Sequence, residues 1–339
     1  MFDRYIYGMM IAAFITFIST PLVRALAIKI GAVDVPKDNR RVHTKPIPRM
    51  GGLAIYVGFM VTMMRYSYIS KSSMIGIFLG STILVILGIA DDRVELSAKV
   101  KFGFQILAAL CLVVFGIKID ILTNFINPST YVQLGLLGVP LTVFWVVGIT
   151  NTVNFIDGLD GLAAGISTIG ALTLAYVAHV NGRYEIAFMT LLLAGACIGF
   201  LPFNFNPAKI FMGDTGSMLL GFLLAAISID GAIKGATAVA LVVPFLALGL
   251  PIFDTAFAIF RRLLNNKPIT EADKGHLHHR FLSIGFGHKK AVLSLYFISS
   301  LFGISTVFLV NNNIVNFIGI VLVAFTLILI PISRTIERK

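Results

Sequence analysis

Aspartates recur in short polar motifs of a chain that is otherwise strongly apolar. The motifs are ADD, NFIDGLDG and FMGDTGS, and their carboxylates belong to Asp91, Asp92, Asp157, Asp160 and Asp214. A carboxylate near hydrocarbon is costly and tends to be functional. Paired carboxylates can bind Mg²⁺ or act as a general base. The motifs therefore indicate a metal-assisted or acid–base site, with solvated helix ends and helix N-caps as the structural alternatives.

Four polar residues, Asn151, Asn154, Asp157 and Asp160, follow one another at steps of three. On a regular helix each step turns the side chain by about 60°, so the four groups would not converge. Gly158 permits a break in the helix directly after Asp157. We therefore predict that a helix ends near Asp157 and that the break lines a cavity. Polar capping of two helices is the alternative interpretation.

The segment GHLHHR combines histidines with an arginine. Such groups suit the neutralisation of phosphate oxygens during group transfer, because the arginine is always charged. A Zn²⁺ site is a weaker interpretation, since no cysteine is near and the spacing fits no common zinc pattern. A solvated basic loop against anionic lipid is the remaining alternative. The candidate anion-binding residues are His276, His278, His279 and Arg280.

Further side chains could contact a bound phosphate or base. Lys45 lies directly before the segment PIPRMGG, and Lys99 and Lys101 follow the aspartate pair, so these lysines are candidates for phosphate binding. Phe211 could stack on a nucleobase, although ordinary packing is the alternative. Asp254 either supports the site or ends a helix.

Composition shows what positions these residues. The chain has 339 residues, 57% of them hydrophobic and 13% charged, with a mean hydropathy of +0.92. These values exclude a soluble enzyme with a single anchor and predict an all-α polytopic transmembrane helix bundle. About eleven apolar runs approach the length that spans a bilayer. The predicted spans are 5–27, 48–66, 72–90, 102–118, 132–150, 160–180, 185–203, 215–230, 235–259, 291–310 and 314–333.

The distribution of lysine and arginine predicts the orientation. With the N-terminus outside and the C-terminus inside, most of the 27 basic residues lie on the inner face. The polar stretches 30–49 and 261–290 and the aspartate motifs then share that face. We expect a single domain over 1–339, with Pro244 and Pro251 kinking the ninth span. The net charge of +11 reflects these inner loops rather than a nucleic-acid partner.

The motifs RMGG, ADD, NFIDGLDGLAAG, FNFNPAKIFMGDTGS and the histidine loop occur in this order between about Lys37 and Lys290. Together they resemble the polyprenyl-phosphate N-acetylhexosamine-1-phosphate transferases. The resemblance implies transfer of a sugar 1-phosphate from a UDP-sugar to undecaprenyl phosphate, with release of UMP and with Mg²⁺, or alternatively Mn²⁺, as cofactor. Glu95 stands where the branch using UDP-MurNAc-pentapeptide has a lysine. The resemblance therefore favours the UDP-N-acetylglucosamine branch, which initiates cell-envelope polysaccharides.

The resemblance also implies roles for individual residues. Asp214 matches the family's metal-binding aspartate, and Asn154 would join it. Our own hypothesis is that Mg²⁺ is held by Asp214 with Asn154 or Asp157, and that either Asp91 or Asp92 orients or deprotonates the acceptor phosphate. The same resemblance implies a homodimer in the bacterial inner membrane with its active site facing the cytoplasm. The implied nucleotide contacts are Gly158, Asp160, Asn204 and Phe211, with Phe211 beneath the uracil; the sugar and diphosphate contacts are His276, His278, His279 and Arg280; and the further phosphate contacts are Lys45 and Lys99.

Two other functions remain open at this level. A transporter or lipid flippase would also have many spans and kinked helices, but it would place ionisable groups near the bilayer midplane rather than at one interface. The same chemistry on another UDP-sugar, such as UDP-MurNAc-pentapeptide or UDP-N-acetylgalactosamine, is the closer alternative, because a small change in a sugar pocket alters specificity. Direct attack and a covalent aspartyl intermediate are both compatible with the sequence.

Overall fold

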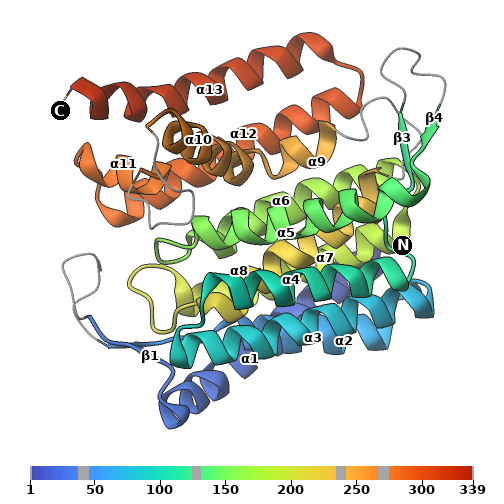
Figure 1. Ribbon diagram of the computed structural model, residues 1–339, viewed down its shortest axis with the longest axis horizontal. Coiled ribbons are helices and arrows are strands. Elements are labelled where there is room, and N and C mark those ends of the chain that lie inside the picture. The colour runs from blue at the N-terminus through green and yellow to red at the C-terminus, as the bar shows by residue number, and fades with distance from the viewer. Residues whose placement is uncertain (1, 37–45, 124–130, 234–241, 266–274, 338–339) are drawn as a thin grey trace.

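The computed structural model describes residues 2–36, 46–123, 131–233, 242–265 and 275–337. Most of these residues form helices that run roughly along the long axis of the molecule (Figure 1). The helices are α1 Phe2–Ile30, α2 Gly52–Tyr66, α3 Lys71–Val94, α4 Ala98–Val114, α5 Gly138–Ile156, α6 Leu162–Val180, α7 Tyr184–Asn204, α8 Gly213–Ser228, α9 Val242–Ala247, α10 Gly249–Leu264, α11 Leu277–Ser283, α12 His288–Val310 and α13 Ile314–Glu337.

Short elements complete the fold at both ends of the bundle. Strands β1 (Val33–Asp34) and β2 (Ile47–Pro48) pair antiparallel, as do β3 (Ile121–Thr123) and β4 (Tyr131–Gln133). A 3₁₀ turn at Gly135–Leu137 precedes α5, and a π-helical turn at Ile229–Ile233 follows α8. In Figure 1, β1 and α11 lie at the end opposite to β3 and β4, and the two chain termini lie at opposite ends.

The polytopic all-α prediction is confirmed. Within the described residues, eight helical segments are long and apolar enough to cross a membrane. Helix α2, with 15 residues, and α4, with 17, are shorter. The eight segments are Phe2–Ile30, Lys71–Val94, Gly135–Ile156, Leu162–Val180, Tyr184–Asn204, Gly213–Gly231, His288–Val310 and Ile314–Ser333.

Two predicted spans differ from the structure. From residue 242 onward, the span predicted at 235–259 consists of two helices, α9 and α10, rather than one kinked helix. Pro251 has no N–H for the Ala247 carbonyl, so α9 ends there and the proline lies in the first turn of α10. The span predicted at 132–150 instead begins at Gly138, because residues 131–133 pair with β3.

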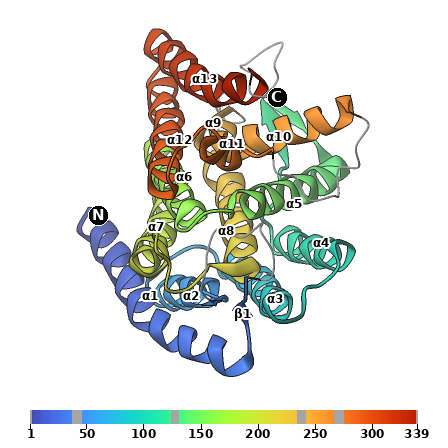
Figure 2. The same cartoon turned by 90° about the vertical axis from the view of Figure 1, so that its left-hand side faces the viewer.

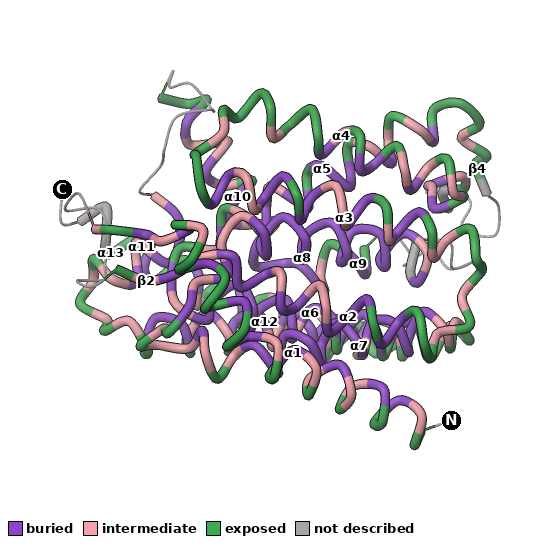
Figure 3. The backbone as a smooth tube through the Cα atoms, turned by 90° about the horizontal axis from the view of Figure 1, so that it is seen from below, coloured by how far each residue is buried: buried purple, intermediate pink, exposed green. Residues whose placement is uncertain are grey.

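Helix α8 occupies the centre of the bundle. Its side chains are buried from Thr215 to Ser228, and Figure 3 shows the buried backbone concentrated at this core. Added Cβ atoms at Gly52, Gly88 and Gly221 would overlap the backbones of α8 or α5. Small residues therefore let α2, α3 and α5 approach α8 backbone to backbone. This packing fixes the N-terminal end of α8, which carries Asp214.

Replacing Gly52 by alanine is expected to destabilise the protein by about 1–3 kcal/mol, because the new methyl group would overlap the backbone of Thr215 and Gly216. Thermal unfolding of the purified protein in detergent measures the effect. Gly103→Ala is the matched control, since this exposed helical glycine faces open space; alanine there should be neutral or stabilising. Equal unfolding temperatures for the two variants would contradict the packing argument.

Candidate active site

A cavity of about 680 Å³ lies among the segments that end on the β1 side of the bundle. We call it the acidic cavity, because carboxylates from several segments far apart in the sequence line it. Figure 2 views the molecule from this end, where the helices surround α8. The predicted site residues that line the cavity are Asp92, Asn154, Asp157, Gly158, Asp160, Asn204, Phe211, Asp214 and His279.

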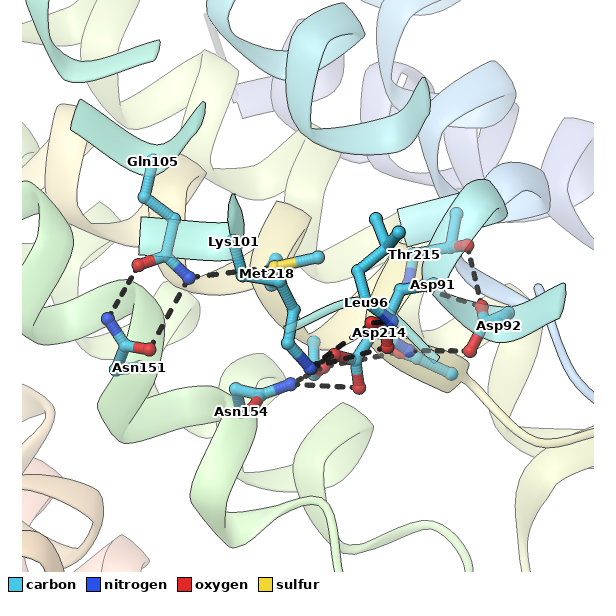
Figure 4. A network of polar contacts seen from close by, with 12 residues as sticks. Asp91, Asp92, Leu96, Lys101, Gln105, Asn151, Asn154, Asp214, Thr215 and Met218 are labelled. Atoms are coloured by element: carbon cyan, nitrogen blue, oxygen red, sulfur yellow. Dashed lines mark hydrogen bonds and ion pairs between the residues drawn. The ribbon is translucent and has the colours of Figure 1, made fainter. Parts of the chain in front are cut away.

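A lysine joins two of the predicted carboxylates beside this cavity. Lys101 Nζ lies 2.8 Å from Asp214 Oδ2 and 3.3 Å from a carboxylate oxygen of Asp91. Asn154 Nδ2 donates to Asp214 Oδ1 at 3.2 Å and to Ser217 Oγ at 2.7 Å. Figure 4 shows these side chains converging from α3, α4, α5 and α8. The structure thus brings Asp91, Asn154 and Asp214 together, as the sequence predicted for one site.

Asp92 has a different environment from its neighbour. Its carboxylate accepts hydrogen bonds from the backbone N–H of Asp214 at 3.0 Å and of Thr215 at 3.3 Å, and from the Thr215 hydroxyl at 2.7 Å. These groups belong to the first turn of α8, where N–H groups have no partner within the helix. Asp92 therefore acts as a side-chain cap from another helix and holds Asp214 in place.

The left side of Figure 4 shows a polar pair beside the carboxylate cluster. Asn151 Nδ2 donates to Gln105 Oε1 at 2.7 Å. Gln105 lies one helical turn after Lys101 on α4, and Asn151 lies one turn before Asn154 on α5. The pair therefore fixes α4 against α5, so that Lys101 and Asn154 contact the two different carboxylate oxygens of Asp214.

The break after α5 is confirmed. The helix ends at Ile156, and Asp157 and Gly158 leave it for the lining of the cavity. Burial, together with the carboxylates of Asp214 and Asp92, raises the pKa of Asp157 to about 8, against the opposing effect of Arg49. The Asp157 carboxyl is therefore mostly neutral at pH 7 and can donate a hydrogen bond.

Asp160 and Asn204 tie the same loop to the FNFNPAKIF segment. Asp160 Oδ2 accepts from Asn206 Nδ2 at 2.8 Å and from the backbone N–H of Ala208 at 3.1 Å. Asn204 Oδ1 accepts from the Gly161 N–H, and its Nδ2 donates to the Ile210 carbonyl, both at 3.1 Å. Both residues line the cavity, but much of their hydrogen-bonding capacity serves the fold.

The four residues of the histidine loop take different positions. His279 lines the cavity, whereas His278 is only 2% exposed and packs against Gly158. Burial lowers the pKa of His278 well below its usual value, so this ring is neutral. His276 Nδ1 lies 2.9 Å from Asp254 Oδ2, and Arg280 Nε donates to the Gly275 carbonyl.

Asp254 anchors this loop to α10. Besides its contact with His276, its other carboxylate oxygen accepts the Leu277 N–H at 2.8 Å, at the start of α11. Of the two open interpretations of this residue, support of the site fits its position, because it holds the histidine loop against the bundle.

The predicted lysines have different outcomes. Lys45 lies outside the described residues. Lys99 is exposed, and Lys101 instead reaches Asp91 and Asp214. Two residues along a helix turn the side chain by about 200°, so Lys99 and Lys101 lie on nearly opposite faces of α4. The spacing of Lys101 and Gln105, one turn apart, is the sequence signal that could have identified this face.

The RMGG motif joins α2 to the segment before α8. Phe211 donates its N–H to the Pro48 carbonyl and accepts from Gly51 N–H, while Gly52 N–H donates to the Met212 carbonyl. An added Cβ on Gly51 would overlap Phe211 and the Phe200 ring. The backbone around residue 50 therefore lies directly against Phe211 at the cavity wall.

A double-mutant cycle tests the capping role of Asp92. Thr215→Val removes one donor to this carboxylate, and Asp92→Asn removes much of its acceptor capacity. We expect a coupling of about 1 kcal/mol between the two changes in the free energy of unfolding, because they share one interaction. The control cycle pairs Thr215→Val with Asp254→Asn and should be additive, since the carboxylate of Asp254 contacts His276 and Leu277 and not the first turn of α8. If the changes in the free energy of unfolding are additive in both cycles, the capping role of Asp92 is refuted.

The comparisons with known proteins agree with this geometry. Residues 74–232 match the family described as Glycosyl transferase family 4. The chain is 43% identical to a probable undecaprenyl-phosphate N-acetylglucosaminyl 1-phosphate transferase of Bacillus subtilis, over 99% of this chain and 94% of the relative. It is 39% identical to a decaprenyl-phosphate N-acetylglucosaminephosphotransferase of Mycolicibacterium smegmatis, over 95% of this chain and 87% of the relative.

A more distant relative acts on a different sugar. The chain is 32% identical to a phospho-N-acetylmuramoyl-pentapeptide-transferase of Staphylococcus saprophyticus, over 87% of this chain and 95% of the relative. The chain is similar over nearly its full length to relatives named as N-acetylglucosamine enzymes. The membrane helices, with carboxylates at their ends, agree with that similarity. The protein belongs to the glycosyl transferase family 4 of polyprenyl-phosphate sugar-1-phosphate transferases.

Proposed function

We propose that this protein transfers N-acetylglucosamine 1-phosphate from UDP-N-acetylglucosamine to undecaprenyl phosphate, releasing UMP. The printed names of the Bacillus and Mycolicibacterium relatives support the sugar and the polyprenyl acceptor. The observation that carries the proposal is the cluster of Asp91, Lys101 and Asp214 beside a cavity at the ends of membrane helices. Such a position can receive one substrate from water and the other from lipid.

The reaction would take place at the cytoplasmic face of the bacterial inner membrane. The positive-inside rule favours this placement, since the cavity lies at the end where the basic polar stretches gather. The acceptor can keep its polyprenyl tail in the bilayer and present its phosphate at this interface. Its product, a lipid diphosphate sugar, would start a cell-envelope polysaccharide. The homodimer stays a prediction from the resemblance.

Mg²⁺ fits the donor set beside the cavity. It prefers oxygen ligands, retains several waters and usually takes only one or two protein carboxylates together with substrate phosphates. Asp214, which lines the cavity and touches Asn154, supplies such oxygens. In the described residues no three His, Cys, Asp or Glu side chains form a metal cluster, so the proposal requires most of the ligands to come from the substrate and from water. When bound, the ion would neutralise charge on the diphosphate oxygens.

The chain's own residues position the reactants. An oxygen of the acceptor phosphate attacks the β-phosphorus of the donor, and the bond from that phosphorus to the bridging oxygen breaks as UMP leaves. A phosphate monoester has a second pKa of about 6 and scarcely needs a base at neutral pH. Asp91 is bonded to Lys101 and Asp92 to α8. We therefore assign both residues to positioning rather than to proton removal.

The alternatives are less well supported. A transporter would need ionisable groups near the middle of the bundle, whereas the carboxylates of this site lie in the last turn of α3 and the first turn of α8. Another UDP-sugar remains the closer competitor, because the relative from Staphylococcus saprophyticus acts on an N-acetylmuramoyl-pentapeptide substrate. The identity to the Bacillus subtilis and Mycolicibacterium smegmatis enzymes, 43% and 39% against 32%, favours our proposal.

Release of UMP by purified protein in detergent tests the function. With undecaprenyl phosphate and Mg²⁺ present, we expect release from UDP-N-acetylglucosamine and little from UDP-N-acetylgalactosamine or UDP-MurNAc-pentapeptide. Asp214→Asn should lower the rate by about 100-fold or more, since it removes the carboxylate that binds both Lys101 and the proposed ion. Lys29→Gln, at an exposed lysine that does not line the cavity, is the control and should retain activity. Lipid transport without UMP release would refute the transferase.

Removal of the metal tests the cofactor separately. Chelation with EDTA should abolish UMP release, and added Mg²⁺ or Mn²⁺ should restore it, because both are accepted by oxygen ligands. Asn154→Ala should raise the Mg²⁺ concentration needed for half-maximal rate, whereas Asn151→Ala, which alters the pair with Gln105, should affect stability more than metal dependence. Full activity in EDTA would contradict a required divalent ion.

A further inference from the structure

The acidic cavity has few cations with which to receive a phosphate. Besides histidines, its described lining contains the basic residues Arg24, Arg49 and Lys209. Arg24 and Lys209 are exposed, so water and salt screen their charges. The side chain of Arg49 has 25% of its area exposed. Arg49 is therefore the lysine or arginine of this lining whose charge is least screened.

A buried carboxylate orients Arg49. Arg49 Nη2 lies 3.1 Å from Asp34 Oδ2, and the Asp34 side chain has only 9% of its area exposed. The backbone N–H of Arg49 also donates to the Ala32 carbonyl at 2.9 Å. These contacts connect the end of β2 to β1. A guanidinium carries five N–H donors in a fixed plane, so the ion pair with Asp34 fixes its orientation without exhausting its donors.

The same segment places Arg49 beside Phe211. The residues before and close after the arginine, Pro48 and Gly51, both exchange backbone hydrogen bonds with Phe211, at 2.8 and 2.9 Å. Phe211 and Arg49 line the same cavity. An aromatic ring offers a face to a nucleobase, and a guanidinium offers paired donors to phosphate. The two side chains therefore suit the two ends of one nucleotide.

The position of Arg49 also matches the charge of the cavity. Its guanidinium interacts electrostatically with the carboxylates of Asp92, Asp157 and Asp214. An anion entering among these groups is repelled unless a cation lies within range. Lys101 is already paired with two of the cluster's carboxylates. Arg49 lies instead in the segment whose backbone bonds to Phe211, and it supplies positive charge to the cavity from there.

We propose that Arg49, oriented by Asp34, binds the phosphate that stays on the nucleotide when UMP is released. This inference rests on the proposed function, because it requires a UDP-sugar donor. Arg49 then makes its contact before and after transfer, so it contributes to donor affinity and to product inhibition by UMP. Asp34 is a positioning residue that acts through Arg49.

The affinities of UMP and uridine test this proposal directly. Both are measured by calorimetry on the purified full-length protein in detergent with Mg²⁺. In Arg49→Gln, we expect UMP affinity to fall by about 10- to 100-fold, the range of a charge-assisted hydrogen bond. Uridine affinity should stay unchanged, because uridine has no phosphate. Arg49→Lys should restore only part of the loss, and Asp34→Asn should give a smaller loss of the same kind.

A matched control and a kinetic measurement complete the test. Arg93→Gln removes an exposed arginine that does not line the cavity and should leave the UMP-to-uridine ratio unchanged. In Arg49→Gln, KM should rise for UDP-N-acetylglucosamine and not for undecaprenyl phosphate. A rise in KM for the acceptor alone would assign the contact to the lipid phosphate and overturn the proposal.

The two hypotheses fail in distinguishable ways. If wild-type protein releases UMP but Arg49→Gln keeps the wild-type UMP-to-uridine ratio, the role of Arg49 is refuted and the transferase stands. If wild-type protein neither releases nor binds UMP, the proposed function fails and the role of Arg49 fails with it. Retained uridine binding and a cooperative unfolding transition well above the assay temperature show that each variant is folded.

Discussion

The site depends on one contact, the capture of the first turn of α8 by Asp92. Three donors from Asp214 and Thr215 converge on this carboxylate. The favourable interaction of an anion with a helix N-terminus compensates part of the cost of burying it. Because Asp214 lies in the same turn, its direction toward Lys101 and Asn154 follows from this contact. Helices α3, α4, α5 and α8 then converge on a single polar cluster.

Close helix packing makes that contact possible. Gly52 and Gly88 leave no room for side chains between their helices and the beginning of α8. Larger residues would separate the helices and carry Asp92 away from the N–H groups that it caps. The RMGG motif is therefore both a packing device and part of the cavity wall, since its backbone also bonds to Phe211 and Met212.

Much of this arrangement could be predicted from the sequence, because it follows from strong local signals. The glycine after Asp157 and the step of three between polar residues predicted the end of α5 correctly. Hydropathy predicted the membrane helices but not that residues 131–133 pair with β3. The choice of Lys101 over Lys99 depends on which face of α4 packs against α3 and α5, and only the one-turn spacing of Lys101 and Gln105 indicates that face in the sequence. The burial of His278 under Gly158 is a tertiary contact between distant segments, without a local pattern.

The order of residues around the cavity bears on how the protein is made. The lining begins at Arg24 on α1 and ends at His288, the first residue of α12. A chain emerging from the ribosome must therefore insert most of its helices before the last wall of the cavity exists. Until then, Asp92 and Asp214 are in place without His279 and His288 on the other side of the cavity. The complete cavity therefore forms only after the start of α12 has been made.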